Sequence, residues 1–252
     1  MLFAIAVKRK KRAKVLLFSE LTKLFCIFFY FNADYSKKML YFCTQNAKKR
    51  MLITTKAIVL NLQRHSDRSH ILHTYTQHSG RINFLVYGVG SKKKSAALYA
   101  PLSLIEITAD IRPDRSIPTL KEARLLRAAN SPNAALVTQL KSNAVSLFLA
   151  ELLYGTLRHP MPDETMFHFL ENALSVLDTT TALENFHTSF LMDFAAALGF
   201  AIDEKEHPAL LRVPVSRADR QLLLRQLCDY YALHLDDFRT PLSLDVLIEV
   251  FD

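Results

Sequence analysis

Residues 71–87 read ILHTYTQHSGRINFLVY and are the most informative segment about the fold of the chain. It holds two runs rich in β-branched and aromatic residues, 71–76 and 81–87, with the turn sequence QHSG at 77–80 between them. Strands favour β-branched and aromatic residues, and tight turns favour glycine beside small polar residues. The segment therefore predicts a β-hairpin.

Three further runs of the same kind surround this hairpin. Residues 54–62 (TTKAIVLNL) precede it, and residues 102–109 (LSLIEITA) alternate apolar and polar side chains, as a half-buried strand does. Residues 117–120 form a fifth short run. Five short strands within about 70 residues are typical of a small closed barrel such as the OB-fold. A fragment of a β-sandwich is the competing architecture.

Basic and aromatic residues in this segment predict a nucleic-acid interface. OB-folds bind single strands by combining a positive groove with aromatic side chains on which bases stack. The candidates for phosphate contact are Arg81, Lys92, Lys93, Lys94, Arg112 and Arg115, and the candidates for stacking are Phe84, Tyr87 and Tyr99. In the alternative interpretation, the three consecutive lysines form a solvated turn and the aromatic rings belong to the core.

Beyond residue 130, the apolar residues recur at the spacing of helices rather than strands. Residues that commonly begin helices occur at Ser131-Pro132, Asp163, Ser216 and Ser243, and a further helix is expected from about residue 181 to 198 with Gly199 as its C-cap. We therefore expect an α+β protein, with an OB-fold domain over residues 51–130 and an all-α bundle over residues 131–252.

No catalytic or metal-binding pattern stands out in the sequence. The three cysteines, Cys26, Cys43 and Cys228, form no CxxC pair, and the five glycines form no phosphate-binding loop. Four histidines between residues 65 and 78 lie near Asp67 without tight ligand spacing. These observations predict a protein without enzymatic activity, metal or cofactor, and the cysteine usage is typical of the reducing cytosol.

The charges divide the chain into three parts. Residues 1–50 hold 12 Lys/Arg and 2 Asp/Glu, residues 51–130 hold 12 and 5, and residues 131–252 hold 8 and 17. A basic middle and an acidic end favour separate surfaces for separate partners. Within the acidic end, Arg217 and Arg220 can share one face of a helix, where they either receive an acidic peptide or are solvated.

The first 50 residues differ in composition from the rest and contain 9 of the 16 lysines and 7 of the 17 phenylalanines. Residues 15–31 are largely apolar, but they include Glu20 and Lys23 and lead to no clear small-x-small cleavage site. We interpret residues 1–50 as a leader that is non-native upstream translation or disordered, with the native start at Met51. A signal or membrane anchor is the alternative.

An ordered set of motifs in residues 51–252 resembles the RecO family of bacterial DNA repair and recombination mediators. The set comprises KAIVL at 56–60, Ser66-Asp67 before Ile71-Leu72, Thr76-x-x-x-Gly80-Arg81, YGVG at 87–90 with the basic loop through Ser95, the strand at 102–107, and TLKEA at 119–123. Phe190-x-x-x-Phe194-x-x-x-Leu198-Gly199-Phe200 is similar to the helix before the family's zinc-finger insert. Residues 201–214 contain no cysteine, so a zinc site is not expected here.

The resemblance implies an OB-fold that binds and anneals single-stranded DNA. It also implies the loading of RecA together with RecR, and contact with the acidic C-terminal tail of SSB, for which Arg217 and Arg220 are the candidates. The expected partners are thus single-stranded DNA, RecR, SSB and, indirectly, RecA, in the cytoplasm and without a membrane. Two other hypotheses stay open: a generic single-stranded nucleic-acid-binding OB module with a helical interaction domain, and a membrane-tethered protein with a genuine leader.

Overall fold

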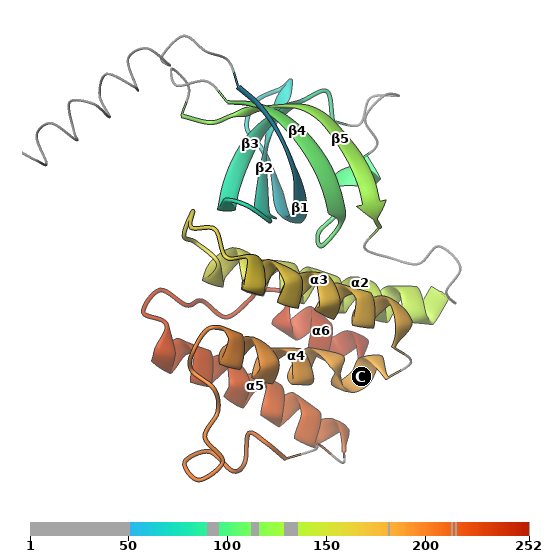
Figure 1. Ribbon diagram of the computed structural model, residues 1–252. Helices are drawn as coiled ribbons and strands as arrows, with labels where there is room; N and C mark the ends of the chain where they lie inside the picture. The colour runs from blue at the N-terminus through green and yellow to red at the C-terminus, as the bar shows by residue number, and fades with distance from the viewer. Residues whose placement is uncertain are drawn as a thin grey trace, which may run out of the picture. The chain divides into compact units, whose positions relative to one another are not determined.

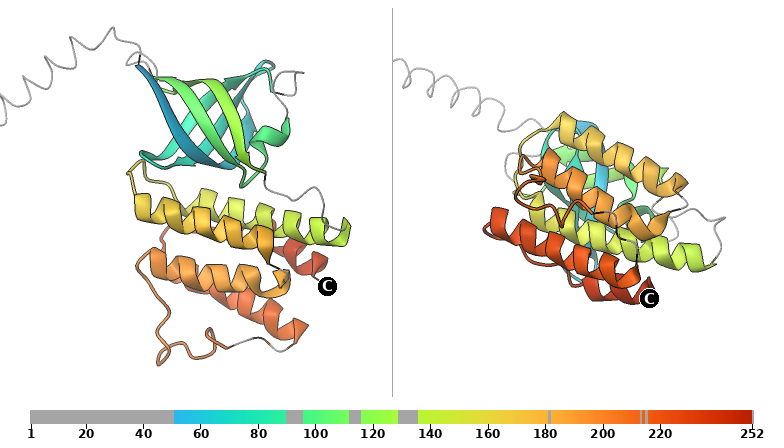
Figure 2. Two further views of the ribbon diagram at one scale, coloured as in Figure 1. Left: turned by 45° about the vertical axis from the view of Figure 1, so that its right-hand side comes forward. Right: turned by 90° about the horizontal axis from the view of Figure 1, so that it is seen from below.

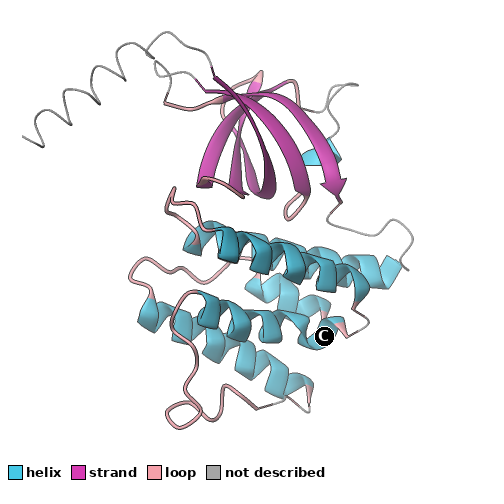
Figure 3. Cartoon of the chain, in the orientation of Figure 1, coloured by secondary structure: helices cyan, strands magenta, loops and turns pink. Residues whose placement is uncertain are grey.

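A computed structural model describes residues 51–89, 96–111, 116–128, 136–180, 182–212, 214 and 216–251. In this part of the chain the strands come first and the α-helices follow in a separate half, and the short 3₁₀-helix η1 lies beside the strands (Figure 1, Figure 3). The elements are β1 (Met51–Arg64), β2 (Ser69–Thr76), β3 (Gly80–Tyr87), η1 (Ala96–Tyr99), β4 (Leu104–Ile111), β5 (Thr119–Arg127), α2 (Leu136–Thr156), α3 (Glu164–Thr179), α4 (Leu183–Ala197), α5 (Arg217–His234) and α6 (Leu244–Val250).

The five strands close into a barrel in the order β1-β2-β3-β5-β4. The long strand β1 pairs with β4 through its first part and with β2 through its second part, and only the short β3–β5 contact is parallel. A five-stranded closed barrel is the OB-type architecture, so this expectation is confirmed and the sandwich alternative is wrong.

The fifth strand is longer than the sequence predicts. Residues 117–120 were the expected run, whereas β5 extends over Thr119–Arg127 and pairs with β4 from Asp110 back to Leu104. The added residues, KEARLLR, have little intrinsic preference for strands. Pairing along β4 holds them in the extended conformation, an effect that local sequence does not reveal.

Successive residues of β1 enter two different hydrophobic cores. Ala57 and Val59 belong to the core inside the barrel, whereas Ile58 and Leu60 belong to the core that continues into the helices. Side chains alternate between the two faces of a strand, so an uninterrupted apolar run at 57–60 indicates burial on both faces. Burial on the outer face shows that this side of the barrel is covered by helices.

Most of the expected helix caps are present. The Asp163 side chain accepts a hydrogen bond from the backbone N–H of Met166, 2.9 Å away, at the start of α3. Ser216 and Asp219 form a reciprocal capping box at the start of α5, and α4 ends before Gly199, whose φ is +93°. Ser243 precedes α6, but its hydroxyl donates to Glu151 instead of capping its own helix. The helix start expected at Ser131-Pro132 lies outside the described residues.

Helices α2 and α3 lie next to the barrel, and α4 and α5 lie beyond them, as the views in Figure 2 show. Their shared core includes a run of aromatic rings, with Phe190 and Phe194 5.5 Å apart and Phe194 and Tyr231 6.2 Å apart between centroids. The Tyr231 hydroxyl donates to the Leu191 carbonyl at 2.7 Å, and burial raises the pKa of this phenol. Among the described residues, no helix has the length and apolar character needed to cross a membrane.

Candidate nucleic-acid interface

The β2–β3 hairpin has its turn docked on the helices. The His78 imidazole lies 3.0 Å from a carboxylate oxygen of Glu164, and the backbone N–H of Arg81 donates to the His159 carbonyl at 3.4 Å. Gly80 has a φ of +61°, and a Cβ atom added there would clash with the Met161 carbonyl oxygen. A glycine is therefore required both by the backbone conformation and by the close approach of the loop before α3.

Arg81 connects the barrel to the end of α2. Its guanidinium donates to the carbonyl oxygens of Tyr154 and Leu157, at 2.8 and 3.0 Å, and its Cζ lies 4.3 Å from the centroid of the Tyr154 ring. Burial lowers the pKa of Arg81 from its ordinary value. Because a cation is favourable at the C-terminal end of a helix, these contacts stabilise the junction. The Arg81 guanidinium thus binds the end of α2 and is not available to contact a phosphate in this structure.

His73, one of the four histidines between residues 65 and 78, belongs to the same junction. Its Nδ1 lies 2.7 Å from Oδ1 of Asn83, and its ring meets the Tyr154 ring edge-on with centroids 5.0 Å apart. The pKa of His73 is lowered, chiefly by burial. A histidine within a β-rich run was the only sequence signal, and it does not by itself distinguish a buried contact from a surface position.

The opposite end of the hairpin is open and carries the best remaining candidate for base stacking. Ser69 pairs with Tyr87, seven residues along the ladder from the Thr76–Gly80 pair, which corresponds to about 23 Å. Tyr87 is 48% exposed there. Beside it runs the β1–β2 loop, in which the Arg68 carbonyl accepts from the Gly88 N–H at 3.5 Å, and Asp67 of this loop pairs with Arg64, the last residue of β1, at 2.8 Å. This end combines an exposed aromatic ring with two exposed arginines.

The other two aromatic candidates lie inside the barrel. Phe84 is completely buried and Tyr99 is 2% exposed, and both pack with Leu72 and Ile107. Burial also raises the pKa of the Tyr99 phenol. A base cannot stack on a ring that is enclosed by the barrel core, so the expectation of stacking is corrected for these two residues, and Tyr87 remains.

The loop cations lie outside the described residues. These are Lys92, Lys93, Lys94, Arg112 and Arg115. On the described barrel surface, Arg124 pairs with Glu106 at 3.1 Å, and Lys121 lies 3.9 Å from the buried carboxylate of Asp110. Arg127 is 13% exposed and forms a bidentate pair with Asp178 of α3, so it serves the junction with the helices.

Arg217 and Arg220 come together on α5 as the helical spacing predicts. They border a small cavity of about 20 Å³ together with Glu184, His187 and Phe251. His187 is deeply buried, and burial lowers its pKa to about 4. The pKa of Glu184 is also lowered, first by a hydrogen bond from its own backbone and then by Lys141. The cavity is too small for a peptide side chain, so any acidic partner would bind over its rim.

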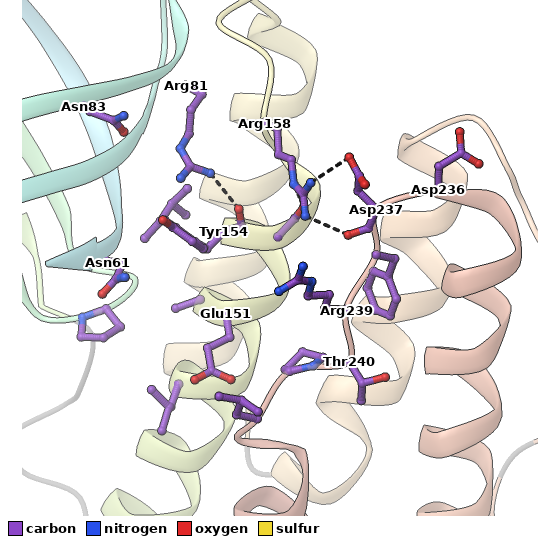
Figure 4. Close-up of a pocket in the computed structure, with 18 residues that line it drawn as sticks. Asn61, Arg81, Asn83, Glu151, Tyr154, Arg158, Asp236, Asp237, Arg239 and Thr240 are labelled. Carbon is purple, nitrogen blue, oxygen red and sulfur yellow. Dashed lines mark hydrogen bonds and ion pairs between the residues drawn. The ribbon is translucent and has the colours of Figure 1, made fainter. Parts of the chain in front are cut away.

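A larger cleft, of about 860 Å³, opens between the barrel, α2 and the segment from α5 to α6 (Figure 4). Two charged residues of this cleft are held by neighbours: Arg158 pairs with Asp237 at 3.1 Å, and Glu151 accepts from the backbone N–H and the hydroxyl of Ser243 at 2.9 and 2.8 Å. Groups of three or more residues able to hold a metal ion are absent from the part of the chain that the structure describes.

Fold and site together define an OB-fold protein with an attached helical bundle. The family model described as Recombination protein O N terminal matches residues 51–129, and the one described as Recombination protein O C terminal matches residues 137–209. The chain belongs to the RecO family and is a DNA repair and recombination protein.

Curated relatives align with this chain over their whole length. The chain is similar to DNA repair protein RecO of Bacteroides fragilis, with 32% identity over 246 residues, and to that of Phocaeicola vulgatus, with 32% over 245 residues. Its similarity to DNA repair protein RecO of Flavobacterium johnsoniae is 29% over 240 residues. In each case the alignment covers 80% of this chain and 100% of the relative.

Proposed function

We propose that the protein is a non-enzymatic recombination mediator of the cytoplasm. It binds single-stranded DNA on its barrel, promotes strand annealing and, with RecR, loads RecA onto DNA coated by SSB. The observation that carries this proposal is a closed five-stranded barrel of the RecO family in which the exposed Tyr87 lies next to the β1–β2 loop with its exposed arginine Arg68. A sequence-neutral mediator needs such a surface, because it must bind any exposed single strand.

The proposed DNA surface extends from Tyr87 into the two basic loops. Stacking on one aromatic ring contributes about 1–3 kcal/mol per base and tolerates any base. Arg64 ends β1 and Arg68 lies in the β1–β2 loop, whose backbone bonds to Gly88 next to Tyr87, and Lys92 follows Tyr87 by five residues in the sequence. Lys93 and Lys94, and Arg112 and Arg115 between β4 and β5, are proposed to add phosphate contacts to this surface.

The helical part is proposed to bind protein partners. Residues 131–252 carry a net charge of −9, which repels DNA phosphates. This half of the chain is therefore better suited to bind a protein than DNA. Arg217 and Arg220 are proposed as the contact for the acidic tail of SSB, because they stand together on α5 in an otherwise acidic region and border an apolar rim that includes Phe251.

The test is a fluorescence-anisotropy titration of a labelled dT oligonucleotide over a series of salt concentrations. We expect binding that weakens steeply with salt, with the log–log slope falling by about 0.7 for each phosphate contact removed. Lys93→Glu lowers both the affinity and the slope, and Tyr87→Ala lowers the affinity with little change in slope. Lys205→Glu, which makes the same charge change on an exposed residue of the helical part, leaves both unchanged.

Two results would contradict the proposal. One is the absence of binding at low salt, and the other is equal loss in Lys93→Glu and Lys205→Glu. The second candidate function, a generic OB-fold module for single-stranded nucleic acid, predicts the same titration. It is distinguished by RecR, which binds the mediator and does not bind the generic module.

A further inference from the structure

Exposed apolar side chains gather on one face of α2 and α6. Leu140 and Leu147 on α2 are 53% and 39% exposed, Leu242, two residues before α6, is 89% exposed, and Val246 on α6 is 47% exposed. Leu140 and Leu147 are seven residues apart, so they occupy one side of α2. Single exposed leucines are ordinary on a protein surface, but neighbouring exposed apolar residues on two packed helices mark an interaction surface.

Helices α2 and α6 pack against each other in antiparallel orientation. Ser243, just before α6, bonds to Glu151 near the end of α2, whereas Phe251, just after α6, lies under Lys141 near the start of α2, with Nζ 5.1 Å from the ring centroid. Leu147 and Leu242 line the same cleft from the two sides. At this end the apolar surface of α2 and α6 is hollowed into the cleft of Figure 4, and we call this region the α2–α6 groove.

The polar groups at the cleft end of this groove indicate the charge of the occupant. Arg81 and Arg158 are held by backbone carbonyls and by Asp237. The Arg239 side chain points into the cleft and is exposed, with no hydrogen bond or ion pair to any of the described residues (Figure 4). A carboxylate from the occupant would complete its pairing. Glu151, Asp236 and Asp237 line the same cleft and disfavour the phosphates of a nucleic acid.

We propose that this α2–α6 groove docks an amphipathic helix of a partner protein, with apolar anchors one and two turns apart and a carboxylate placed at Arg239. Leu140 and Leu147 are separated by about 10.5 Å along α2, which is also the rise between anchors at positions i and i+7 of a bound helix. The groove uses different residues from the proposed DNA surface, so partner docking and DNA binding are separable.

The experiment measures fluorescence anisotropy of a stapled synthetic helix on the full chain. The helix carries leucines at i, i+4 and i+7 and a glutamate at the end that would face Arg239, and a second helix has lysine in place of that glutamate. We expect Leu242→Glu to weaken binding of the glutamate helix at least tenfold. Leu233→Glu, at a leucine 79% exposed on α5, is the matched control and leaves binding unchanged. Arg239→Glu reverses the preference between the two helices.

Both substituted leucines are highly exposed, so unchanged thermal melting and dT titration verify that each variant is folded. The proposal is overturned if neither helix binds saturably, or if Leu242→Glu and Leu233→Glu behave alike. It is also overturned if the chain dimerises in sedimentation and Leu242→Glu abolishes the dimer, because a second copy then fills the groove. Displacement of the bound helix by a dT oligonucleotide would overturn it in favour of nucleic acid.

Discussion

Replacement of Arg81 by alanine tests whether this residue joins the barrel to the helices or contacts DNA. The substitution removes two hydrogen bonds from a charged donor, to the Tyr154 and Leu157 carbonyls, and a cation–π contact with the Tyr154 ring. Charged hydrogen bonds contribute about 1.5–3 kcal/mol each, and a partly buried cation–π contact about 1–2 kcal/mol. Removing the guanidinium also relieves its desolvation, so we expect a net loss of about 3 kcal/mol in the free energy of unfolding.

Urea denaturation followed by circular dichroism measures this loss. With a slope of about 2 kcal/mol per molar urea, the midpoint should fall by about 1.5 M. Arg81→Lys should recover part of the loss, because an ammonium keeps the charge without the planar fork that reaches both carbonyls. Arg64→Ala is the matched control: it also removes one positive charge, but its side chain is 71% exposed and pairs with an exposed carboxylate, so stability should change by less than about 0.5 kcal/mol.

The same variants separate structural and DNA-binding roles. Under conditions in which all are folded, Arg81→Ala should keep the salt slope of dT binding, and Arg64→Ala should lower it by about 0.7. Our reasoning about Arg81 is refuted if its removal costs less than about 0.5 kcal/mol. A lowered salt slope with unchanged stability would restore the sequence-based assignment of Arg81 to DNA.

Further substitutions at three places in the fold test the local arguments. Gly80→Ala should destabilise the fold by more than about 2 kcal/mol, because φ is +61° and the new Cβ meets a backbone carbonyl. Gly155→Ala is its control: a Cβ there meets nothing within 4 Å, so this variant should be neutral or stabilised by up to about 1 kcal/mol. Thermal melts measure both variants. Burial lowers the pKa of His187 from 6.5 to about 4, so protonation favours the unfolded chain. Between pH 7 and pH 5, the free energy of unfolding of the wild type should therefore fall by about 2 kcal/mol more than that of His187→Leu. Parallel profiles of stability against pH for the two proteins would contradict this. Ser216→Ala should cost about 1 kcal/mol by removing the capping box with Asp219, and a double-mutant cycle with Asp219→Ala should show coupling rather than additivity.

Local sequence patterns correctly predicted the features of the fold that depend on interactions within a few residues. The turn glycine Gly80 between two β-rich runs indicated the hairpin, Asp163 and Ser216 indicated the helix starts, and Gly199 indicated the end of α4. Each of these residues acts through its own backbone conformation or through hydrogen bonds to the next turn. The sequence also indicated the basic character of the barrel and the acidic character of the helices.

The site was only partly predictable, because exposure depends on contacts between distant segments. Phe84, Tyr87 and Tyr99 look equivalent in the sequence, yet closing the barrel buries two of these rings and leaves Tyr87 at the surface. Arg81 looks like any cation beside a turn, and it becomes a junction residue only because the end of α2 presents carbonyl oxygens to it.

From the sequence alone we predict the order and type of the elements, the OB-type barrel, the charge of each half and the family. These follow from side-chain alternation, capping and composition, which act over a few residues. The folded chain is needed to see which cations stay available, which aromatic ring is exposed, and that α2 and α6 together form an apolar groove. Burial and pairing depend on which distant segment packs against each side chain, and a local sequence pattern does not identify that segment.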